Sequence, residues 1–346
     1  MLSSVRLHEL KALLQSAQMP VFLFDNDADG LCSFLIARRA LGVGEGIPVR
    51  TYPSLDPAYV DKAVGYGADM IVVLDKPFLS EVFITRVIES GLPLVIIDHH
   101  AIPQPAWQNV YPHCSVFNPA LERNASAEPV SYILFRALGR ADDLWLAGAG
   151  CIADHHLPDF WEEVVERYPE YAHAIKSPFE GYYETDLGRL AQSFNFGLKD
   201  SLSAVKKLLA HLIRCAGPSD VLGEQAPSSF RTKVQTLQTA LEQHVRDAGI
   251  PSEGMIVYQY GGATSMSADI ANKLSYRYSS SLIVVIYLNG ATANVSLRGK
   301  NVQVLFEKIL PAFPSASGGG HADAIGARLL ARDVPQFINR LKEERA

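Results

Sequence analysis

Residues 21–30 read Val-Phe-Leu-Phe-Asp-Asn-Asp-Ala-Asp-Gly, a short apolar run that stops at three alternating acids, Asp25, Asp27 and Asp29. A continuous apolar run of this length is typical of a strand buried on both faces of a parallel sheet. On an extended chain, residues two positions apart point the same way, so we expect the three carboxylates on one side. Like charges this close resist ionising together, and a divalent metal ion is the simplest group that makes such a cluster favourable.

The same pattern occurs twice more along the chain. Residues 71–74 are apolar and run into Asp75, and residues 94–97 are apolar and run into Asp98-His99-His100. Ligands of α/β proteins collect at the carboxyl ends of the parallel strands, where these side chains would meet. A solvated turn, for which Asp-Gly is a common pair, is the alternative at the first cluster. Three strands that end in carboxylates or imidazoles favour one metal site, and this mixture of ligands suits manganese better than calcium.

Helical patterns alternate with these apolar runs and predict an α/β architecture with a parallel sheet. They cover residues 31–41, 57–66 and 79–90, and a further helix is expected from residue 128, before the Gly/Ala-rich stretch at 146–153. Residues 160–245 are mostly helical in pattern. We therefore predict three parts, which are an N-terminal parallel-sheet domain at residues 1–185, a helical linker at 186–250 and a smaller α/β domain at 251–346.

The smaller domain is expected to contain strands at 255–260, 282–288 and 293–298. The stretch Pro-Ser-Ala-Ser-Gly-Gly-Gly-His at residues 314–321 reads as a glycine-rich loop that leads into a helix. This last part of the chain is basic, with 10 Lys and Arg against 7 Asp and Glu in residues 251–346. The basic excess predicts that an anionic substrate binds there.

The composition indicates a folded protein of a reducing compartment. Of the 346 residues, 48% are hydrophobic and 20% are charged, which is enough apolar material for a substantial core. Four cysteines without CxxC spacing argue against a disulfide framework and against a zinc knuckle. The N-terminus has no apolar signal core, and no run of about 18 apolar residues occurs, so we expect a cytoplasmic protein with no membrane segment. The net charge of −6 excludes a general polyanion-binding protein.

The order of these motifs resembles the DHH phosphoesterase family. The resemblance rests on Asp-x-Asp-x-Asp-Gly at residues 25–30, the lone Asp75, Asp98-His99-His100, and an acid after a Gly/Ala-rich stretch, Asp154. The glycine-rich loop, with Ser-Leu-Arg at residues 296–298 upstream, is similar to the DHH-associated domain of that family. Within the family, the use of Asp25 where many relatives have His resembles the RecJ nucleases.

The resemblance implies two manganese ions about 3.5–4 Å apart, with magnesium as a substitute, that promote in-line attack of water on a phosphorus atom. It implies that Asp25 and Asp27 hold the first ion, that Asp29 and His99 hold the second, and that Asp75 and Asp154 contact or bridge both. His100 would face the scissile phosphate as a catalytic residue, and Asp98 would orient a histidine. In the C-terminal domain, the implied substrate contacts are Arg298, His321 and the backbone N–H groups of Gly318, Gly319 and Gly320.

Two features depart from the family pattern. A second Asp-His-His string occurs at residues 154–156, and its context matches the last metal acid, so we expect His155 and His156 to be structural or rim residues. Lys76 is an unusual neighbour for a metal-binding acid, and we expect it to meet either a substrate phosphate or a carboxylate.

These features predict a manganese-dependent phosphodiesterase that trims single-stranded, short oligonucleotides to mononucleotides. One alternative is a phosphodiesterase for linear or cyclic dinucleotide signals or for a phosphorylated nucleotide. A second alternative is a non-catalytic DHH scaffold in a nucleic-acid-processing assembly, although such scaffolds lose metal acids and none is missing here. The expected partners are the oligonucleotide or dinucleotide substrate, with room for a homodimer or a nucleic-acid-processing partner.

Overall fold

The computed structural model of the chain describes residues 1–51, 54–101, 111 and 113–345. The chain divides into two units, residues 1–234 and residues 235–346, and the division falls within one long helix. Both units are α/β, with a parallel sheet in the first unit and a smaller mixed sheet in the second, so the predicted fold class is confirmed.

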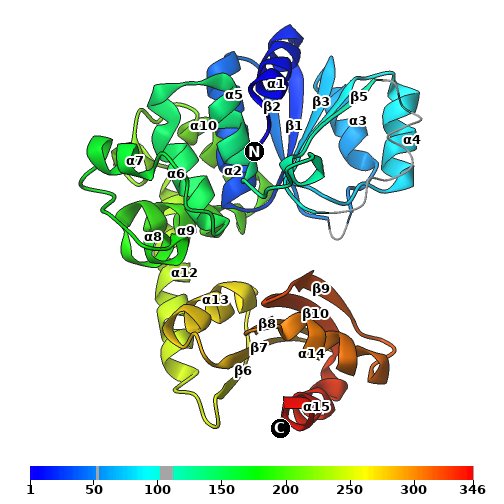
Figure 1. The fold of residues 1–346 in the computed structure, drawn as a ribbon, viewed down its shortest axis with the longest axis vertical. Coiled ribbons are helices and arrows are strands. Elements are labelled where there is room, and N and C mark those ends of the chain that lie inside the picture. The colour runs from blue at the N-terminus through cyan, green and yellow to red at the C-terminus, as the bar shows by residue number, and fades with distance from the viewer. Residues whose placement is uncertain (52–53, 102–110, 112, 346) are drawn as a thin grey trace. The chain divides into compact units, whose positions relative to one another are not determined.

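The N-terminal unit contains a five-stranded sheet in the order β2-β1-β3-β4-β5, and every neighbouring pair is parallel (Figure 1). The predicted strands at 21–24, 71–74 and 93–97 are confirmed as the three central strands, and the two edge strands were not predicted. The bounds are β1 Pro20–Asp25, β2 Glu45–Val49, β3 Met70–Leu74, β4 Leu94–Ile97 and β5 Cys114–Phe117.

Helices cover both faces of this sheet (Figure 1). On one face, alternate strand residues such as Leu23 and Val73 pack in one buried cluster with α3 and α4. On the other face, Phe22 and Phe24 contact Phe34 of α2, with ring centroids 5.8 Å and 5.2 Å apart. The helices of this unit are α1 Ser4–Ser16, α2 Ala28–Leu41, α3 Ala58–Gly65, α4 Glu81–Ser90, α5 Val130–Leu138, α6 Leu144–Ala153, α7 Trp161–Arg167, α8 Pro178–Glu184, α9 Asp186–Leu198, α10 Leu202–Leu212 and α11 Pro218–Val221, with short 3₁₀ turns η2 Pro119–Leu121 and η3 Ala141–Asp143.

The C-terminal unit contains a second five-stranded sheet, in the order β6-β7-β8-β10-β9, in which only the β6–β7 pair is parallel. Its core lies between the sheet and α14 and α15, with Phe306 and Phe337 fully buried, while α13 packs on β7 and β8. The elements are β6 Met255–Gly261, β7 Leu282–Asn289, β8 Thr292–Arg298, β9 Ser317–His321, β10 Ala324–Leu330, α13 Ser267–Arg277, α14 Val302–Ile309 and α15 Val334–Arg345, with η4 Leu310–Ala312 and η5 Ala331–Asp333; α12 Ser228–Asp247 contains the division between the units.

The glycine-rich segment was predicted as a loop that leads into a helix, and that prediction is wrong. Residues 317–321 form the edge strand β9, which pairs with β10 in antiparallel register, and the next helix begins only at Val334. The physical reason is close packing, because a Cβ atom at Gly320 would lie 2.2 Å from the carbonyl oxygen of Ala324. Gly320 therefore permits the pairing of β9 with β10, and the segment does not open into a loop.

No helix in the described ranges is long and apolar enough to cross a membrane.

Candidate metal centre

The three acids of the first motif do not lie on one extended segment, so that part of the sequence prediction is wrong. Only Asp25 belongs to β1; Asp27 is the N-cap of α2, and Asp29 lies in the first turn of that helix. The side chain of Asp27 accepts a hydrogen bond of 2.9 Å from the backbone N–H of Gly30, as an N-cap carboxylate does. Gly30 is required here, because a Cβ atom on it would lie 2.4 Å from the carbonyl oxygen of Asp25.

Asp29 is buried and caps a second helix. Its carboxylate accepts hydrogen bonds from the backbone N–H of Val130 at 2.9 Å and of Ser131 at 3.2 Å, and from the Ser131 hydroxyl. These donors lie at the start of α5, where Pro129 offers no capping side chain. Burial and the charge of Asp75 raise the pKa of Asp29 to about 6, against the opposing effect of His99 and the Ser131 hydrogen bonds. Sequence reasoning missed Ser131, although a serine at a helix start is a capping signal.

Asp75 follows β3 directly and has an unusual backbone conformation. Its φ of +56° is in the left-handed region, which is uncommon for a residue with a side chain and which clusters at functional sites. The side chain is buried, and its Oδ1 atom has no hydrogen-bond partner among the described residues. Burial works against ionisation, but the contacts with His99 and the charges of His100 and Lys76 outweigh it and lower the pKa of Asp75.

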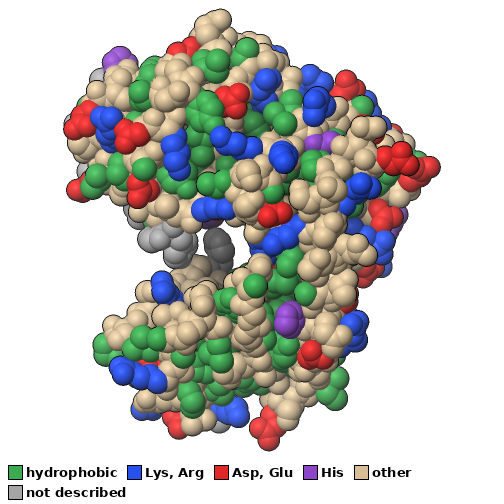
Figure 2. Space-filling model, turned by 180° about the vertical axis from the view of Figure 1, so that it is seen from behind, with side chains coloured by type: hydrophobic (Ala, Val, Ile, Leu, Met, Phe, Trp, Pro, Cys, Tyr) green, Lys and Arg blue, Asp and Glu red, His purple; other side chains and the backbone are tan. Residues whose placement is uncertain are grey.

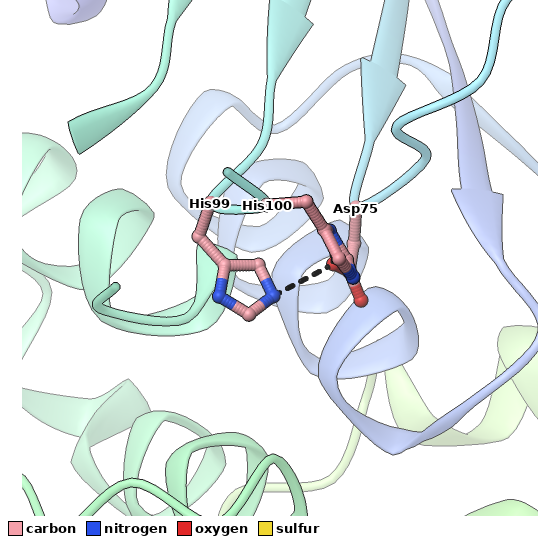
Figure 3. A group of neighbouring side chains, drawn as sticks. All are labelled: Asp75, His99 and His100. Atoms are coloured by element: carbon pink, nitrogen blue, oxygen red, sulfur yellow. Dashed lines mark ion pairs between the residues drawn. The ribbon is translucent and has the colours of Figure 1, made fainter. Parts of the chain in front are cut away.

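Asp98, His99 and His100 follow β4, which ends at Ile97, so the three residues are not part of the regular strand. Adjacent residues of a regular strand face opposite ways, but here both imidazoles turn toward Asp75 (Figure 3). The Nε2 atom of His99 lies 3.2 Å from Oδ1 of Asp75, and Nδ1 of His100 lies 3.8 Å from the same oxygen. The two rings are 4.5 Å apart between centroids.

Asp98 fixes the position of His100. Its Oδ1 accepts a hydrogen bond of 2.7 Å from the backbone N–H of His100, and Nδ1 of the same residue lies 3.1 Å from that oxygen. The side chain of Asn118 donates to the carbonyl oxygen of His100 at 3.0 Å, a contact that no sequence pattern indicated. Burial opposes protonation of His100, but its hydrogen bond to Asp98 and the charge of Asp98 raise its pKa.

Asp154 reaches His99 from the end of helix α6 and not from the sheet. It is the residue that ends α6, the helix formed by the buried Gly/Ala-rich stretch, and its Oδ2 lies 3.4 Å from Nε2 of His99. Burial raises the pKa of Asp154 to about 8, with a further contribution from Asp29 and Asp75 and against the effect of His99. Burial opposes protonation of His99, but Asp75, Asp154 and Asp29 outweigh it and raise its pKa to about 11.

The residues around Asp75 fit a divalent metal ion. Oδ1 of Asp75 and Nε2 of His99 are buried and 3.2 Å apart, yet neither makes a hydrogen bond within the described part of the chain. Carboxylate and imidazole together suit manganese and related ions. Asp75, His99 and His100 can present one ligand atom each within 4.8 Å of one another. Asp75 and His99 were predicted as metal ligands and His100 as a catalytic residue, and Asp154 adjoins the group through His99.

The second Asp-His-His string packs differently. His155 has a φ of +56° and stacks on Phe179, with ring centroids 4.2 Å apart and an interplanar angle of 14°. His156 makes an edge contact with Tyr132 at 5.7 Å, and burial lowers its pKa. These contacts accord with structural positions, and the assignment of both histidines outside the metal ligands stays a prediction.

The predicted substrate residues lie together in the C-terminal unit. Arg298 and His321 both pair with Ala324 of β10, one from each neighbouring strand. The Arg298 guanidinium donates to Asn272 of α13 at 2.5 Å and to the Leu297 carbonyl oxygen at 2.7 Å. A Cβ atom at Gly319 would meet nothing within 4 Å. The side chain of His321 lies outside those the structure describes.

Comparison with family models gives a match in the C-terminal unit. Residues 253–345 match the family model of the DHHA1 domain. The structure of the chain is similar to RecJ from Thermus thermophilus in complex with Mn²⁺, with a TM-score of 0.70 and 16% identity over 97% of this chain and 54% of that one. Residues 253–345 are thus identified as a DHHA1 domain, and the chain as a whole shares its fold with RecJ.

Two further solved structures cover nearly the whole of this chain. An exonuclease RecJ bound to manganese matches with a TM-score of 0.65 and 18% identity, covering 97% of this chain and 93% of that chain. The DHH domain of a protein assigned to a family of ribosomal proteins matches with a TM-score of 0.65 and 14% identity, covering 98% and 89%. The chain thus spans about half the length of the Thermus RecJ and most of the other two. No curated protein matches it by sequence.

Proposed function

We propose that this chain is a divalent-metal-dependent phosphodiesterase. The observation that carries the proposal is the group of Asp75, His99 and His100 at the carboxyl ends of β3 and β4, with two buried ligand atoms that have no hydrogen bond among the described residues. The fold, shared with RecJ structures that hold Mn²⁺, supports the choice of a metal-dependent reaction. A bound divalent ion supplies Lewis-acid activation of water and of a phosphate oxygen.

The chain's own residues have three roles in the proposed reaction. Asp75, His99 and Asp154 would hold a divalent ion, and the DHH resemblance adds Asp25, Asp27 and Asp29 as ligands that would complete a site for two ions. His100, oriented by Asp98 at 2.7 and 3.1 Å, faces the scissile phosphate and stabilises the charge that develops on it.

In the DHHA1 domain, Arg298, His321 and the strand at Gly318–Gly320 bind the nucleotide that leaves. A guanidinium forms strong charge-assisted hydrogen bonds with a phosphate, and the basic excess of residues 251–346 favours an anion there. We propose residues 1–185 as the catalytic domain, 186–250 as the helical linker and 251–346 as the substrate-binding domain.

The proposed substrate is a short single-stranded oligonucleotide, degraded to mononucleotides with manganese or magnesium. The net charge is −6, and on the face drawn in Figure 2 the Lys and Arg side chains lie among Asp and Glu side chains. A surface of this kind suits a short substrate better than a long polyanion. We place the protein in the cytoplasm, as a monomer, a homodimer or a companion of a nucleic-acid-processing protein.

The proposal is tested with end-labelled RNA and DNA single strands, from a dinucleotide to a long oligonucleotide, in chelator and with added manganese, magnesium or calcium. We expect release of mononucleotides that requires metal, is fastest with manganese and favours the short strands. The Asp75→Asn variant should be inactive. The matched control is Asp61→Asn, because Asp61 is an exposed acid paired with Arg86 on the surface.

Three outcomes would redirect the assignment. Full activity in chelator contradicts a metal-dependent reaction. Hydrolysis of dinucleotides alone supports the alternative of a dinucleotide phosphodiesterase. A protein that binds manganese and hydrolyses none of these strands supports a scaffold.

A further inference from the structure

Lys76 is buried beside the metal centre. It follows Asp75 directly, its side chain is 7% exposed, and its Nζ atom donates a hydrogen bond of 2.9 Å to Oδ1 of Asp25. Asp25 is one of the two acids that the DHH resemblance assigns to the first of two metal ions. The Lys76 ammonium group therefore contacts an acid that was expected to bind a metal ion.

The backbone explains why these two side chains meet. β1 and β3 are neighbouring parallel strands, and Phe24 pairs with Leu74. Asp25, the last residue of β1, therefore lies beside Asp75 and Lys76, which follow β3. The left-handed conformation of Asp75 turns the chain directly after β3. As a result, Asp75 contacts His99, while the next residue, Lys76, contacts Asp25. The ion pair is thus fixed by the ends of two core strands and not by a mobile surface loop.

The charges of the cluster give Lys76 a role. Lys76 and Asp25 form an ion pair, with the Lys76 Nζ atom 2.9 Å from Oδ1 of Asp25. A buried ammonium is stable only with a counter-charge, and the half-buried carboxylate of Asp25 supplies it to Lys76.

Other contacts leave few ligands for a second ion. Both oxygens of Asp29 accept hydrogen bonds from Val130 and Ser131, and one oxygen of Asp27 caps α2. By contrast, the Asp75 and His99 atoms that face each other have no hydrogen bond within the described residues. The Asp75 and His99 ligand atoms that lack a hydrogen bond among the described residues therefore lie together, 3.2 Å apart.

We propose that the Lys76 ammonium replaces one of the two divalent ions implied by the DHH resemblance, so that this chain binds a single metal ion at Asp75, His99 and Asp154. The proposal deepens the proposed function, because it specifies the metal content of the same site. Lys76 supplies the positive charge at Asp25 permanently. A compact, strongly hydrated ammonium can do this, and it also repels a second cation from the adjoining position.

The test counts bound manganese in the full chain without substrate, by equilibrium dialysis with elemental analysis and by electron paramagnetic resonance. We expect one ion per chain in the parent, with the hyperfine spectrum of an isolated Mn²⁺. Lys76→Met removes the charge but keeps a long side chain, and should bind a second ion with the spectrum of a spin-coupled pair. Lys76→Arg should stay at one ion, as should the control Lys62→Met, which changes an exposed lysine of α3.

The double variant Lys76→Met with Asp25→Asn should return to one ion, because the freed carboxylate is then absent. Two ions in the parent, or one ion in a folded Lys76→Met variant, would overturn the proposal. Parent protein that binds one ion but hydrolyses no strand contradicts the proposed function and leaves the role of Lys76 standing. Parent protein that binds two ions and hydrolyses oligonucleotides supports the proposed function and contradicts the role proposed for Lys76. Parent protein that binds no ion contradicts the proposed function and the role of Lys76 alike.

Discussion

His99 lies between two carboxylates that reach it from different parts of the N-terminal unit. Asp75 comes from the end of β3 and Asp154 from the end of α6, at 3.2 and 3.4 Å from the same ring nitrogen. Without metal, the imidazole is protonated and holds the two acids together, which accords with its pKa of about 11. In the proposed reaction, a metal ion bound at this position would hold the two acids instead, and the imidazole would have to lose its proton first.

We predict different effects of alanine substitutions in His99 and His100 and in His155 and His156. His99→Ala should abolish stoichiometric manganese binding, because the ring nitrogen between the two acids is lost. His100→Ala should keep the metal and turn over at least about a hundredfold more slowly, as for loss of a positioned charge-stabilising group. Isothermal titration with manganese and single-turnover hydrolysis measure the two effects.

His155→Ala and His156→Ala are the matched controls, and both should stay within about tenfold of the parent rate. The rings of His155 and His156 pack on Phe179 and Tyr132, so these variants can melt at a lower temperature. Normal metal binding in such a variant still agrees with the prediction. If either control loses the metal while His99→Ala retains it, the two Asp-His-His strings have been assigned the wrong way round.

Residue-level patterns predicted part of the centre. The meeting of Asp75 with His99 and His100 could be foreseen, because parallel strands that pair in register end at one edge of the sheet. The placement of Asp27 and Asp29 could not be read from alternation, since the helix begins at Ala28. An aspartate at an N-cap and another in the first turn are helix-start signals, and here they compete with the strand pattern.

At the scale of elements, the edge strand β9 depends on glycine at two of three neighbouring positions. A Cβ atom at Gly318 would lie 2.6 Å from the carbonyl oxygen of Gly326, and one at Gly320 would lie 2.2 Å from that of Ala324. Gly320 also has a φ of +156°, which disfavours any other residue. Gly319 has open space around its Cβ position.

This arrangement predicts contrasting effects of alanine along one strand. Gly318→Ala and Gly320→Ala should each destabilise the DHHA1 domain, by about 1–3 kcal/mol as for other overpacked positions. Gly319→Ala should leave stability within about 0.5 kcal/mol. Denaturant unfolding and hydrogen exchange in β9 and β10 measure the difference. Equal stability of all three variants would show that β9 does not pack on β10 as described.

Patterning of single elements also explains which strands were foreseen. β1, β3 and β4 are central and buried on both faces, so they form continuous apolar runs. β2 contains Gly46 and Pro48, and β9 is mostly glycine, so neither has a strand pattern of its own. Both lie at sheet edges, where the neighbouring strand, and not local sequence, determines the conformation.

At the scale of the whole molecule, the cluster of Asp75, His99 and Asp154 links stability to pH. The pKa of Asp154 is raised to about 8 from the ordinary 3.8, so the folded state binds that proton more tightly, and this contribution is lost as pH rises between these values. The pKa of His99 is raised to about 11 from 6.5, so its contribution is also lost with rising pH, beginning near 6.5. The lowered pKa of Asp75 acts only below its ordinary value of 3.8.

Metal-free protein should therefore melt at a lower temperature at pH 8 than at pH 6. Manganese should raise the melting temperature more at pH 8, because fewer protons must leave the ligands when it binds. Differential scanning fluorimetry in chelator and with manganese, at both pH values, checks this. The Asp154→Asn variant should show a smaller pH difference in chelator. An equal effect of manganese at both pH values would contradict this linkage.

The carboxylate of Asp29 also bears on the order in which the N-terminal unit folds. Its donors on α5 lie 101 and 102 positions further along the chain. A helix of nine residues is marginal alone, and closing a loop of about 100 residues costs entropy before the contact contributes anything. A growing chain can complete β1 and α2 early, yet the acid stays without its donors until Ser131 has been synthesised and has docked. We expect this contact to form late, as the step that closes the unit around its centre.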